Sequence, residues 1–517
     1  MGAKQSAGIR WGDVVVAAVA AVSWALIAMA CIAALGLHLL GADSAGSLGP
    51  MAAAVVALAV GGSVSPSGDV SAFGLEGAEA HTAIDIAPLG VGLVGALVLA
   101  LIFLRSLRGT GVVISGGELA ARVGAVAALF VAMVGGLAWV GHDVITIDGG
   151  ALGLGELPDG GGLLPDGIAD SLPDGLGDIG GLLPDRLGDL VQAEASVGFT
   201  VNAGESLAGG AGWVLGVLAI ALLASRRAPL PRGWEVLHRV VRPAVSALVS
   251  VVLVAVLAGL AAAAYAAVGD DNPQRIAGAA LLGAPNGVWL AIPLGLFVPW
   301  DGAATGELAK LLPDPLDELL RVSAQQPVTV GRLAELDGRV WLLAVAMALL
   351  MLYAGVLTAV RTPRPAGLGA AGFAGRCALR LGVVAAVALP LLVWLTGVSA
   401  GASLSVLGVD AFGAGIELHG SAGTALLLGA VWGAGAGGLG AVLACASGAA
   451  GGRVAPPARG DRAYPDLGPY TPSPGYRPSH DETNPYLRSA DAWYGAPTVT
   501  GPPLPPPPPP GPPSDRP

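Results

Sequence analysis

The sequence predicts an all-α integral membrane protein, and three properties of the 517-residue chain lead to that fold class. Its mean hydropathy is +0.71. Hydrophobic residues make up 54% of the chain and charged residues only 12%, whereas soluble domains carry about 25% charged residues. Eight apolar runs are also long enough to cross a bilayer, which takes about 20 helical residues. A water-soluble fold is therefore excluded.

Each of the eight runs lacks Asp, Glu, Lys and Arg and predicts one transmembrane helix. The runs cover residues 14–40, 88–104, 123–141, 207–224, 244–268, 340–360, 381–400 and 421–445. Two further apolar runs are ambiguous. Residues 51–64 are fewer than the about 20 residues that a helix needs to cross the bilayer. Residues 276–300 are interrupted by a cluster of residues that disfavour a helix: Gly283, Pro285, Asn286 and Gly287. We interpret both runs as re-entrant or broken outer segments, and we expect the four named residues to form the turn of the second.

The distribution of basic residues predicts the orientation, because Lys and Arg near membrane ends collect in the cytoplasm. With eight spans and a cytoplasmic amino terminus, 20 of the 26 basic residues lie inside and 28 of the 37 acidic residues lie outside. If both ambiguous runs also crossed, the basic residues would divide into 14 inside and 12 outside. We therefore expect eight spans in the plasma membrane, with both chain termini in the cytoplasm.

Similar features recur in the two halves of the chain and predict an internal duplication. Tryptophan follows a basic residue at the start of each half, at Trp11 and Trp234, and an Arg-x-x-Arg motif ends the second span of each half, at 105–108 and 361–364. Each half has four spans, so the two repeats run parallel rather than inverted. We expect a first repeat at residues 1–227, which includes an acidic outer loop at 142–205, and a second repeat at residues 228–446.

Short segments of alternating character lie just outside each returning span, at residues 69–76, 194–202, 327–331 and 402–410. Alternation with Val, Thr and Phe is a strand signal. Because open strands cannot stand in lipid, these segments are expected to pair above the membrane as a small extracytoplasmic cap. The alternative is four unrelated loops that happen to contain valine.

Residues 61–90, which begin Gly-Gly-Ser-Val-Ser-Pro-Ser-Gly-Asp-Val, lead into Phe-Leu-Arg-Ser-Leu-Arg at 103–108. This stretch resembles the streptophobe family, strongly hydrophobic proteins of Streptomyces and relatives. Pro-Asn-Gly-Val-Trp-Leu at 285–290 and Leu-Phe-Val-Pro-Trp at 296–300 are similar as well. That family is of unknown function, so the resemblance implies a multi-pass membrane protein and assigns no catalytic residue.

No motif in the sequence predicts a catalytic, cofactor-binding or metal site. The loop at 142–205 holds twelve acidic residues, but their spacing matches no calcium-binding motif, and we interpret it as a solvated acidic loop with weak attraction for cations. The net charge of −11 argues against a nucleic-acid partner. The glycines at 429, 433 and 437 fall on one helix face, which allows close packing of a neighbouring helix. Gly429, Gly433 and Gly437 serve either packing within the chain or a homodimer seam.

The composition changes abruptly at residue 447. Residues 447–517 contain 20 of the 40 prolines and five of the seven tyrosines. Such a segment buries too little surface to fold, and its proline run favours polyproline II. We expect a disordered, proline-rich cytoplasmic tail, which either docks onto a partner protein or only solubilises the chain.

Three functions compete for this architecture. A passive channel or transporter would use segments 51–64 and 276–300 as a polar path. A membrane enzyme would need converging titratable groups, and the spans contain none. We therefore expect a non-catalytic envelope scaffold or sensor, which lies in the lipid bilayer and binds an envelope component or partner protein at its outer cap.

Overall fold

The computed structural model describes residues 10–44, 46–68, 78–108, 114–140, 142–147, 195–229, 231, 233–234, 236–305, 327–365, 367–406, 409–455 and 458. In this part of the chain, nine helices are long and apolar enough to cross a membrane. They are α1 (Trp11–Leu39), α3 (Leu89–Arg108), α4 (Gly116–Val140), α6 (Ala203–Ala224), α7 (Arg242–Ala267), α8 (Pro273–Gly295), α11 (Trp341–Arg361), α12 (Ala370–Leu395) and α13 (Ala422–Ala446). The chain is a multi-pass membrane protein.

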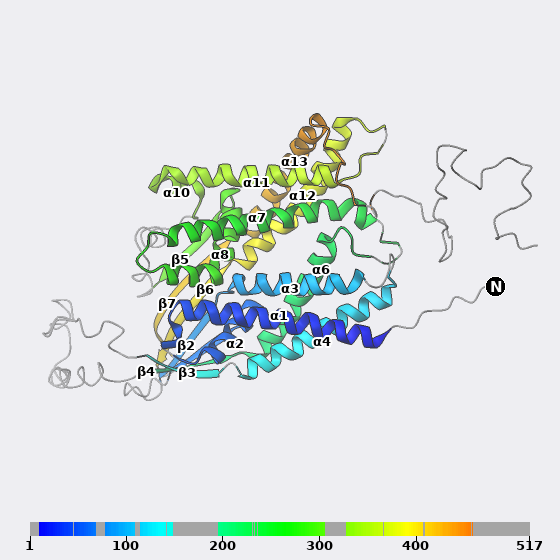
Figure 1. The fold of residues 1–517 in the computed structure, drawn as a ribbon. Helices are drawn as coiled ribbons and strands as arrows, with labels where there is room; N and C mark the ends of the chain where they lie inside the picture. The colour runs from blue at the N-terminus through cyan, green and yellow to red at the C-terminus, as the bar shows by residue number, and fades with distance from the viewer. Residues whose placement is uncertain are drawn as a thin grey trace, which may run out of the picture. The chain divides into compact units, whose positions relative to one another are not determined.

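Seven strands form one antiparallel sheet in the order β3-β4-β1-β2-β6-β7-β5. They are β1 (Val64–Gly68), β2 (Ala78–Asp85), β3 (His142–Ile147), β4 (Ala195–Val201), β5 (Trp300–Thr305), β6 (Val398–Val406) and β7 (Val409–Gly420). All seven lie at one end of the helices, which we call the sheet end (Figure 1). The fold is therefore mostly helical, as predicted, and the described strands gather in a sheet at one end of the helices.

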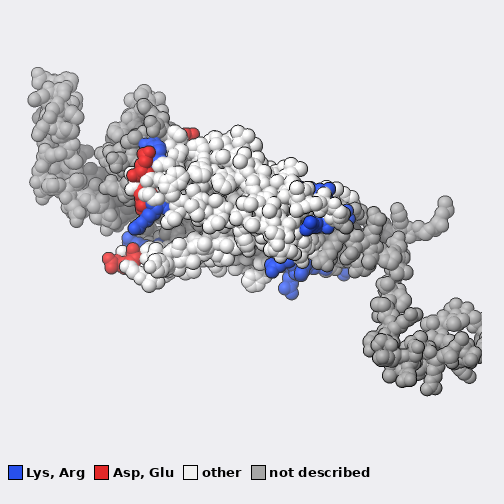
Figure 2. Space-filling model, turned by 90° about the horizontal axis from the view of Figure 1, so that it is seen from above, with Lys and Arg blue, Asp and Glu red and all other residues white. Residues whose placement is uncertain are grey.

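The opposite end, which we call the arginine end, holds most of the described basic residues. They are Arg10, Arg105, Arg108, Arg122, Arg226, Arg227, Arg239, Arg242, Arg361, Arg364, Arg376, Arg380 and Arg453. The sheet end instead holds twelve of the described acidic residues: Asp43, Glu79, Asp85, Asp143, Glu205, Asp270, Asp271, Asp301, Glu335, Asp337, Asp410 and Glu417. A band without charged residues separates the charged ends in Figure 2. Such a band is what the hydrocarbon core of a bilayer requires.

Eight of the nine long helices connect the arginine end to the sheet end, whereas α8 does not. The helix α8 begins shortly after the sheet-side end of α7, and its last residue, Gly295, is followed closely by β5. The shorter α2 (Leu48–Ala59) is placed in the same way between α1 and β1. Both α2 and α8 therefore lie between two segments of the sheet end.

The two halves of the chain pair their strands in the same way. In the first half, Val64 at the start of β1 pairs with Ile84 on one side and Val201 on the other. In the second half, Trp300 at the start of β5 pairs with Val328 and Gly420. The first half thus supplies β3-β4-β1-β2 and the second supplies β6-β7-β5, which Val328 extends by an isolated bridge.

The turns that precede β1 and β5 are also alike. Gly61 and Phe297 both have positive φ, 86° and 69°, and each donates its backbone N–H to the carbonyl three residues earlier. The next residue in each half, Gly62 or Val298, donates to the carbonyl five residues earlier. These are the paired hydrogen bonds of a helix C-cap in which a left-handed residue ends the helix.

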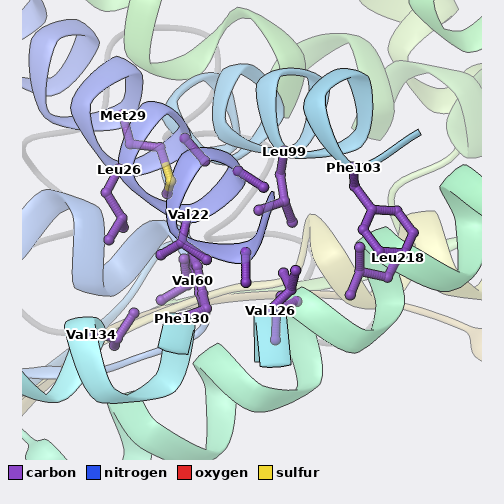
Figure 3. Close-up of a cluster of buried hydrophobic side chains, with 14 of the residues drawn as sticks. Val22, Leu26, Met29, Val60, Leu99, Phe103, Val126, Phe130, Val134 and Leu218 are labelled. Carbon is purple, nitrogen blue, oxygen red and sulfur yellow. The ribbon is translucent and has the colours of Figure 1, made fainter. Parts of the chain in front are cut away.

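Each half packs its own hydrophobic core. In the first half, α1, α3, α4 and α6 surround Met29, Leu99, Phe103, Phe130 and other buried side chains (Figure 3). A second core in the other half includes Ile292, Trp300, Met351 and Leu389. The halves meet where α6 contacts α7, where α8 contacts α1 and α3, and where β2 pairs with β6.

The outward faces of the long helices are apolar and exposed. Leu101, Leu342 and Val387 are each more than 60% exposed, as expected of side chains that contact lipid tails. Large exposed aromatic side chains mark the helix ends: Tyr265, Trp139 and Trp394 at the sheet end and Trp11 at the arginine end. Aromatic belts at both interfaces are typical of membrane-spanning helices.

Several predicted strand and loop boundaries are corrected by the structure. The predicted strand at 194–202 is β4, and the one at 402–410 covers parts of β6 and β7. The segment 327–331 forms only one bridge, at Val328, and the segment 69–76 lies outside the described residues. The first residues of the acidic loop predicted at 142–205 form β3. Its last residues form β4 and the first turn of α6. Its remaining residues, 148–194, are outside the described part.

The boundary predicted for the tail, residue 447, also lies too early in the chain. The N–H of Gly451 donates to Ala359 O and that of Arg453 to Val360 O, both at 3.0–3.2 Å. Val454 and Ala458 are buried. Gly451 and Arg453 therefore bind the end of α11, whereas Ser447, Gly448 and Ala450 bond to the end of α13. Apart from residues 447–455 and 458, the predicted tail lies outside the described residues.

Candidate functional site

The turn predicted at Gly283, Pro285, Asn286 and Gly287 is not present. These residues lie inside α8, which continues through Pro285 and Pro293. A proline in a helix leaves the carbonyl four residues earlier without its usual donor. For Pro285 that carbonyl belongs to Leu281, and it lies directly against Gly90 of α3, where a side chain would clash with the carbonyls of Leu281 and Leu282. The helix therefore continues through the proline that the local sequence pattern marks as a break, and it packs closely against α3 at that point.

Asn286 joins α8 to the beginning of α3. Its Nδ2 donates to Ala87 O at 2.7 Å, and its Oδ1 accepts from Leu89 N at 2.9 Å. The amide therefore satisfies one of the backbone N–H groups that a helix start leaves unpaired. Because α8 belongs to the second half and α3 to the first, this side chain links the two halves.

Aromatic side chains fix the other end of α8. Phe297 stacks on Trp432 with ring centroids 6.4 Å apart and contacts Trp341 at 6.3 Å. Trp432 Nε1 donates to Leu296 O at 3.2 Å, and Trp300 is 1% exposed. A bulky residue at positive φ is strained, and these contacts hold Phe297 in that conformation.

This aromatic cluster was not predicted from the sequence, although a signal for it was present. Trp432 follows Ser421, the N-cap of α13, by the same number of residues as Trp213 follows Asn202, the N-cap of α6. Trp213 in turn stacks on Phe130 at 5.0 Å. Matching the two halves residue by residue would have placed both tryptophans.

Gly429, Gly433 and Gly437 all face α12 of the same chain. A Cβ at these positions would lie 2.5–2.6 Å from the carbonyl oxygens of Ala385, Leu381 and Cys377. All three glycines are buried. All three predicted glycines therefore allow α13 to pack closely against α12 within the same chain.

One recess between the described helices of the second half is apolar. It is lined by Leu248, Val251, Val252, Ile292, Leu296, Leu350, Met351, Ala385, Ala388, Leu389, Leu392 and Gly429. These side chains carry no charge and no strong hydrogen-bonding group.

Polar side chains gather instead where the sheet meets the helices. Asn202 Nδ2 donates to Ser63 Oγ at 2.8 Å and Ser65 Oγ at 3.1 Å, and Ser63 Oγ donates to Glu205. These bonds tie the start of α6 to β1. Within the described residues, no group of three or more His, Cys, Asp and Glu could hold a metal ion.

Comparisons with known proteins give no relative for this arrangement: no family model, curated protein or solved structure matches the chain.

Proposed function

We propose that the chain is a duplicated eight-span protein of the plasma membrane that presents its sheet on the outer side as a non-catalytic scaffold or sensor surface. One observation carries this proposal: both halves contribute to a single seven-stranded sheet, joined by eight residue pairs between β2 and β6. A sheet shared in this way joins the two helical halves to each other. It also offers an extended surface to an envelope component or partner protein.

The orientation follows from the charges at the two ends. The arginine end carries thirteen described arginines with only Asp13 and Glu118 as described acidic residues, so the positive-inside rule favours a cytoplasmic arginine end. The sheet end would then face outward. The helix α8 would lie in the outer part of the membrane, because both of its flanking segments are at the sheet end.

The matching turns at Gly61 and Phe297 and the matching strand pairs support the duplication. They also fit the proposal that the chain is related to the streptophobe family, since two of the stretches that carry this resemblance include those turns. The second repeat would begin at residue 228.

The helices themselves argue against coupled transport. Proton- and ion-coupled carriers place ionisable groups within the bilayer for relays and ion sites. The apolar runs of the eight spans contain no Asp, Glu, Lys or Arg, and the recess between the helices of the second half is lined by apolar residues.

Reconstitution into proteoliposomes tests the functional proposal. We expect no proton-driven uptake and no ion conductance, because the apolar runs of the eight spans contain no charged residue. A photo-crosslinking residue at Asp301 or Glu417, both exposed at the sheet end, should capture a discrete partner in native membranes. The same residue at Leu427, which is 66% exposed on α13, is the lipid-facing control.

A conductance that is reproducible and changes in Asn286→Leu would contradict the scaffold and favour a passive channel along α8. Crosslinks from Leu427 that equal those from Asp301 and Glu417 would contradict a docking surface on the sheet.

A further inference from the structure

The two edges of the sheet differ in how far the described residues cover them. At one edge, Trp300 of β5 forms a further bridge with Val328, and the residue before Val328 is Pro327, which has no backbone N–H. The other edge is β3, which pairs with β4 over six consecutive residues without a register shift. Its sequence, His142–Ile147, contains no proline. The strand β3 thus lacks both the proline and the bulge with which proteins commonly protect an edge strand.

The hydrogen bonds of β4 show which backbone groups of β3 lie at this edge. Asn202 N, directly after β4, donates to Ser63 O at 3.0 Å, so the backbone groups of Asn202 point towards β1. Successive residues of an antiparallel strand point these groups to opposite sides, and the register of β4 with β1 and with β3 is continuous. Phe199 therefore points its backbone groups to β3, where its register partner is Asp143.

The same alternation places three residues of β3 the other way. The backbone N–H and C=O groups of His142, Val144 and Thr146 point away from β4, to the edge of the sheet. Among the described strands, only β4 pairs with β3. A row of such groups is a template on which an extended segment can pair as a further strand.

The direction of β3 limits what can pair with it. The described strand pairings in the sheet are all antiparallel. Because β3 follows the sheet-side end of α4 and leads away from the helices, an antiparallel neighbour has to run towards the membrane. A second copy in the same membrane would present its own β3 in the parallel direction. The edge therefore suits a segment of another protein better than a second copy.

The charge of the sheet end selects the kind of segment. This end holds twelve described acidic residues but only three described arginines, Arg275, Arg332 and Arg339. Asp143 belongs to β3 itself, and the sequence between β3 and β4, residues 148–194, contains ten acidic residues and one arginine. A segment with basic side chains is attracted to such a surface, and one with acidic side chains is repelled.

We infer that the β3 edge binds an extended basic segment of a partner protein, which pairs antiparallel with β3 through its main chain. Main-chain hydrogen bonds supply affinity in this mode of recognition, and the side chains select the partner. The inference rests on the proposed function, since it names the kind of partner that the outer surface binds and the strand that binds it.

A basic model peptide tests this inference with the purified full chain in detergent. The probe is a short fluorescent peptide in which lysine alternates with valine, and its binding is measured by fluorescence anisotropy. We expect this lysine peptide to bind. One analogue carries glutamate in place of lysine, and another is methylated on every backbone nitrogen. Each analogue should bind at least about tenfold more weakly, because the first reverses the charge and the second cannot donate to β3.

Val144→Pro removes one N–H from the edge and leaves the bonds to β4 in place, because the backbone groups of Val144 point outward. Proline is tolerated at such edge positions. This variant should weaken binding of the lysine peptide at least about tenfold and leave the melting temperature nearly unchanged. Ala304→Pro is the matched control. Ala304 lies in β5 and, like Trp300, points its backbone groups away from β7, so its replacement should leave the affinity unchanged.

Amide hydrogen exchange measures the β3 edge directly. In the free chain, the amides of Val144 and Thr146 should exchange faster than those of Asp143 and Ile145, which bond to β4. The lysine peptide should slow the exchange of Val144 and Thr146. Because this measurement and the peptide series use the unaltered chain, the inference stays testable even if Val144→Pro does not fold.

Several results would overturn the inference. No binding of the lysine peptide, or equal binding of its methylated analogue, would show that β3 does not pair with a basic strand. Slow exchange of Val144 and Thr146 in the free chain would show that another part of the chain, or a second copy, already pairs with β3. An equal loss of affinity in Val144→Pro and Ala304→Pro would place the binding elsewhere.

These outcomes are separate from the test of the proposed function. Partner capture from Asp301 or Glu417 without peptide binding at β3 would leave the scaffold in place and remove only the β3 edge. A reproducible conductance in proteoliposomes would contradict the scaffold whether or not the peptide binds.

Discussion

Asn286 is a single polar side chain that connects the two halves of the molecule near the sheet end of the helices. Its two hydrogen bonds, to Ala87 O and Leu89 N, both reach the start of α3. The sequence pattern around this residue predicts a turn. Its actual role depends on α3, almost two hundred residues away, and no local pattern encodes that contact.

Replacing Asn286 by Ala should destabilise the protein by about 1–3 kcal/mol, because the Leu89 N–H and the Ala87 carbonyl lose a half-buried partner. The measurement is the melting temperature in detergent. Asn272→Ala is the control, since Asn272 is exposed and makes no side-chain cap bond at the start of α8. If both variants melt alike, Asn286 does not tie the halves together.

Gly433 illustrates at the scale of a helix how a small residue sets the distance between α12 and α13. A Cβ added there would lie 2.6 Å from Leu381 O and 2.7 Å from Ala385 Cβ. A Cβ added at Gly435 in the same helix would have nothing within 4 Å. The two glycines therefore offer the same substitution in two environments.

Gly433→Ala should lower stability by about 1–3 kcal/mol, the usual cost of overpacking a tight contact. Gly435→Ala should leave stability unchanged or raise it by up to about 1 kcal/mol, because Ala favours the helix over Gly. Thermal unfolding of the two variants side by side provides the measurement. Equal effects would mean that α12 and α13 are not closely packed.

The sequence predicts the long helices well, since freedom from charge over a bilayer-spanning length is a local property. The turn predicted at Gly283, Pro285, Asn286 and Gly287 was wrong, because a local rule treats these residues as helix breakers, whereas α8 continues through them and packs closely against α3 at Gly90. The strands were only partly predicted. Pairs such as β2 with β6 join residues 78–85 to residues 399–406, and alternation alone does not reveal such distant partners.

For the whole molecule, the described fold is expected to be independent of the residues after 460, because the described residues all fall within one compact unit that ends at residue 460. Truncation after Gly460 should leave the melting temperature unchanged. Truncation after Ser447 should lower it, since this removes the backbone bonds of Gly451 and Arg453 to α11 and the buried Val454. A large loss on truncation after Gly460 would show that residues 461–517 stabilise the membrane part.

The eight-span arrangement rests on α8 starting and finishing on the same side of the membrane. Asp271 precedes α8 and Asp301 follows it, and both residues are exposed. Arg227, exposed at the arginine end, serves as the opposite-side control. In a background where Cys31, Cys377 and Cys445 are replaced by Ala, one cysteine is introduced at each position in turn and labelled with an impermeant thiol reagent in intact cells.

We predict that cysteines at Asp271 and Asp301 both react from outside and that a cysteine at Arg227 reacts only after the cells are permeabilised. Labelling of Asp271 and Asp301 from opposite sides would mean that α8 crosses the membrane, and it would contradict the eight-span account.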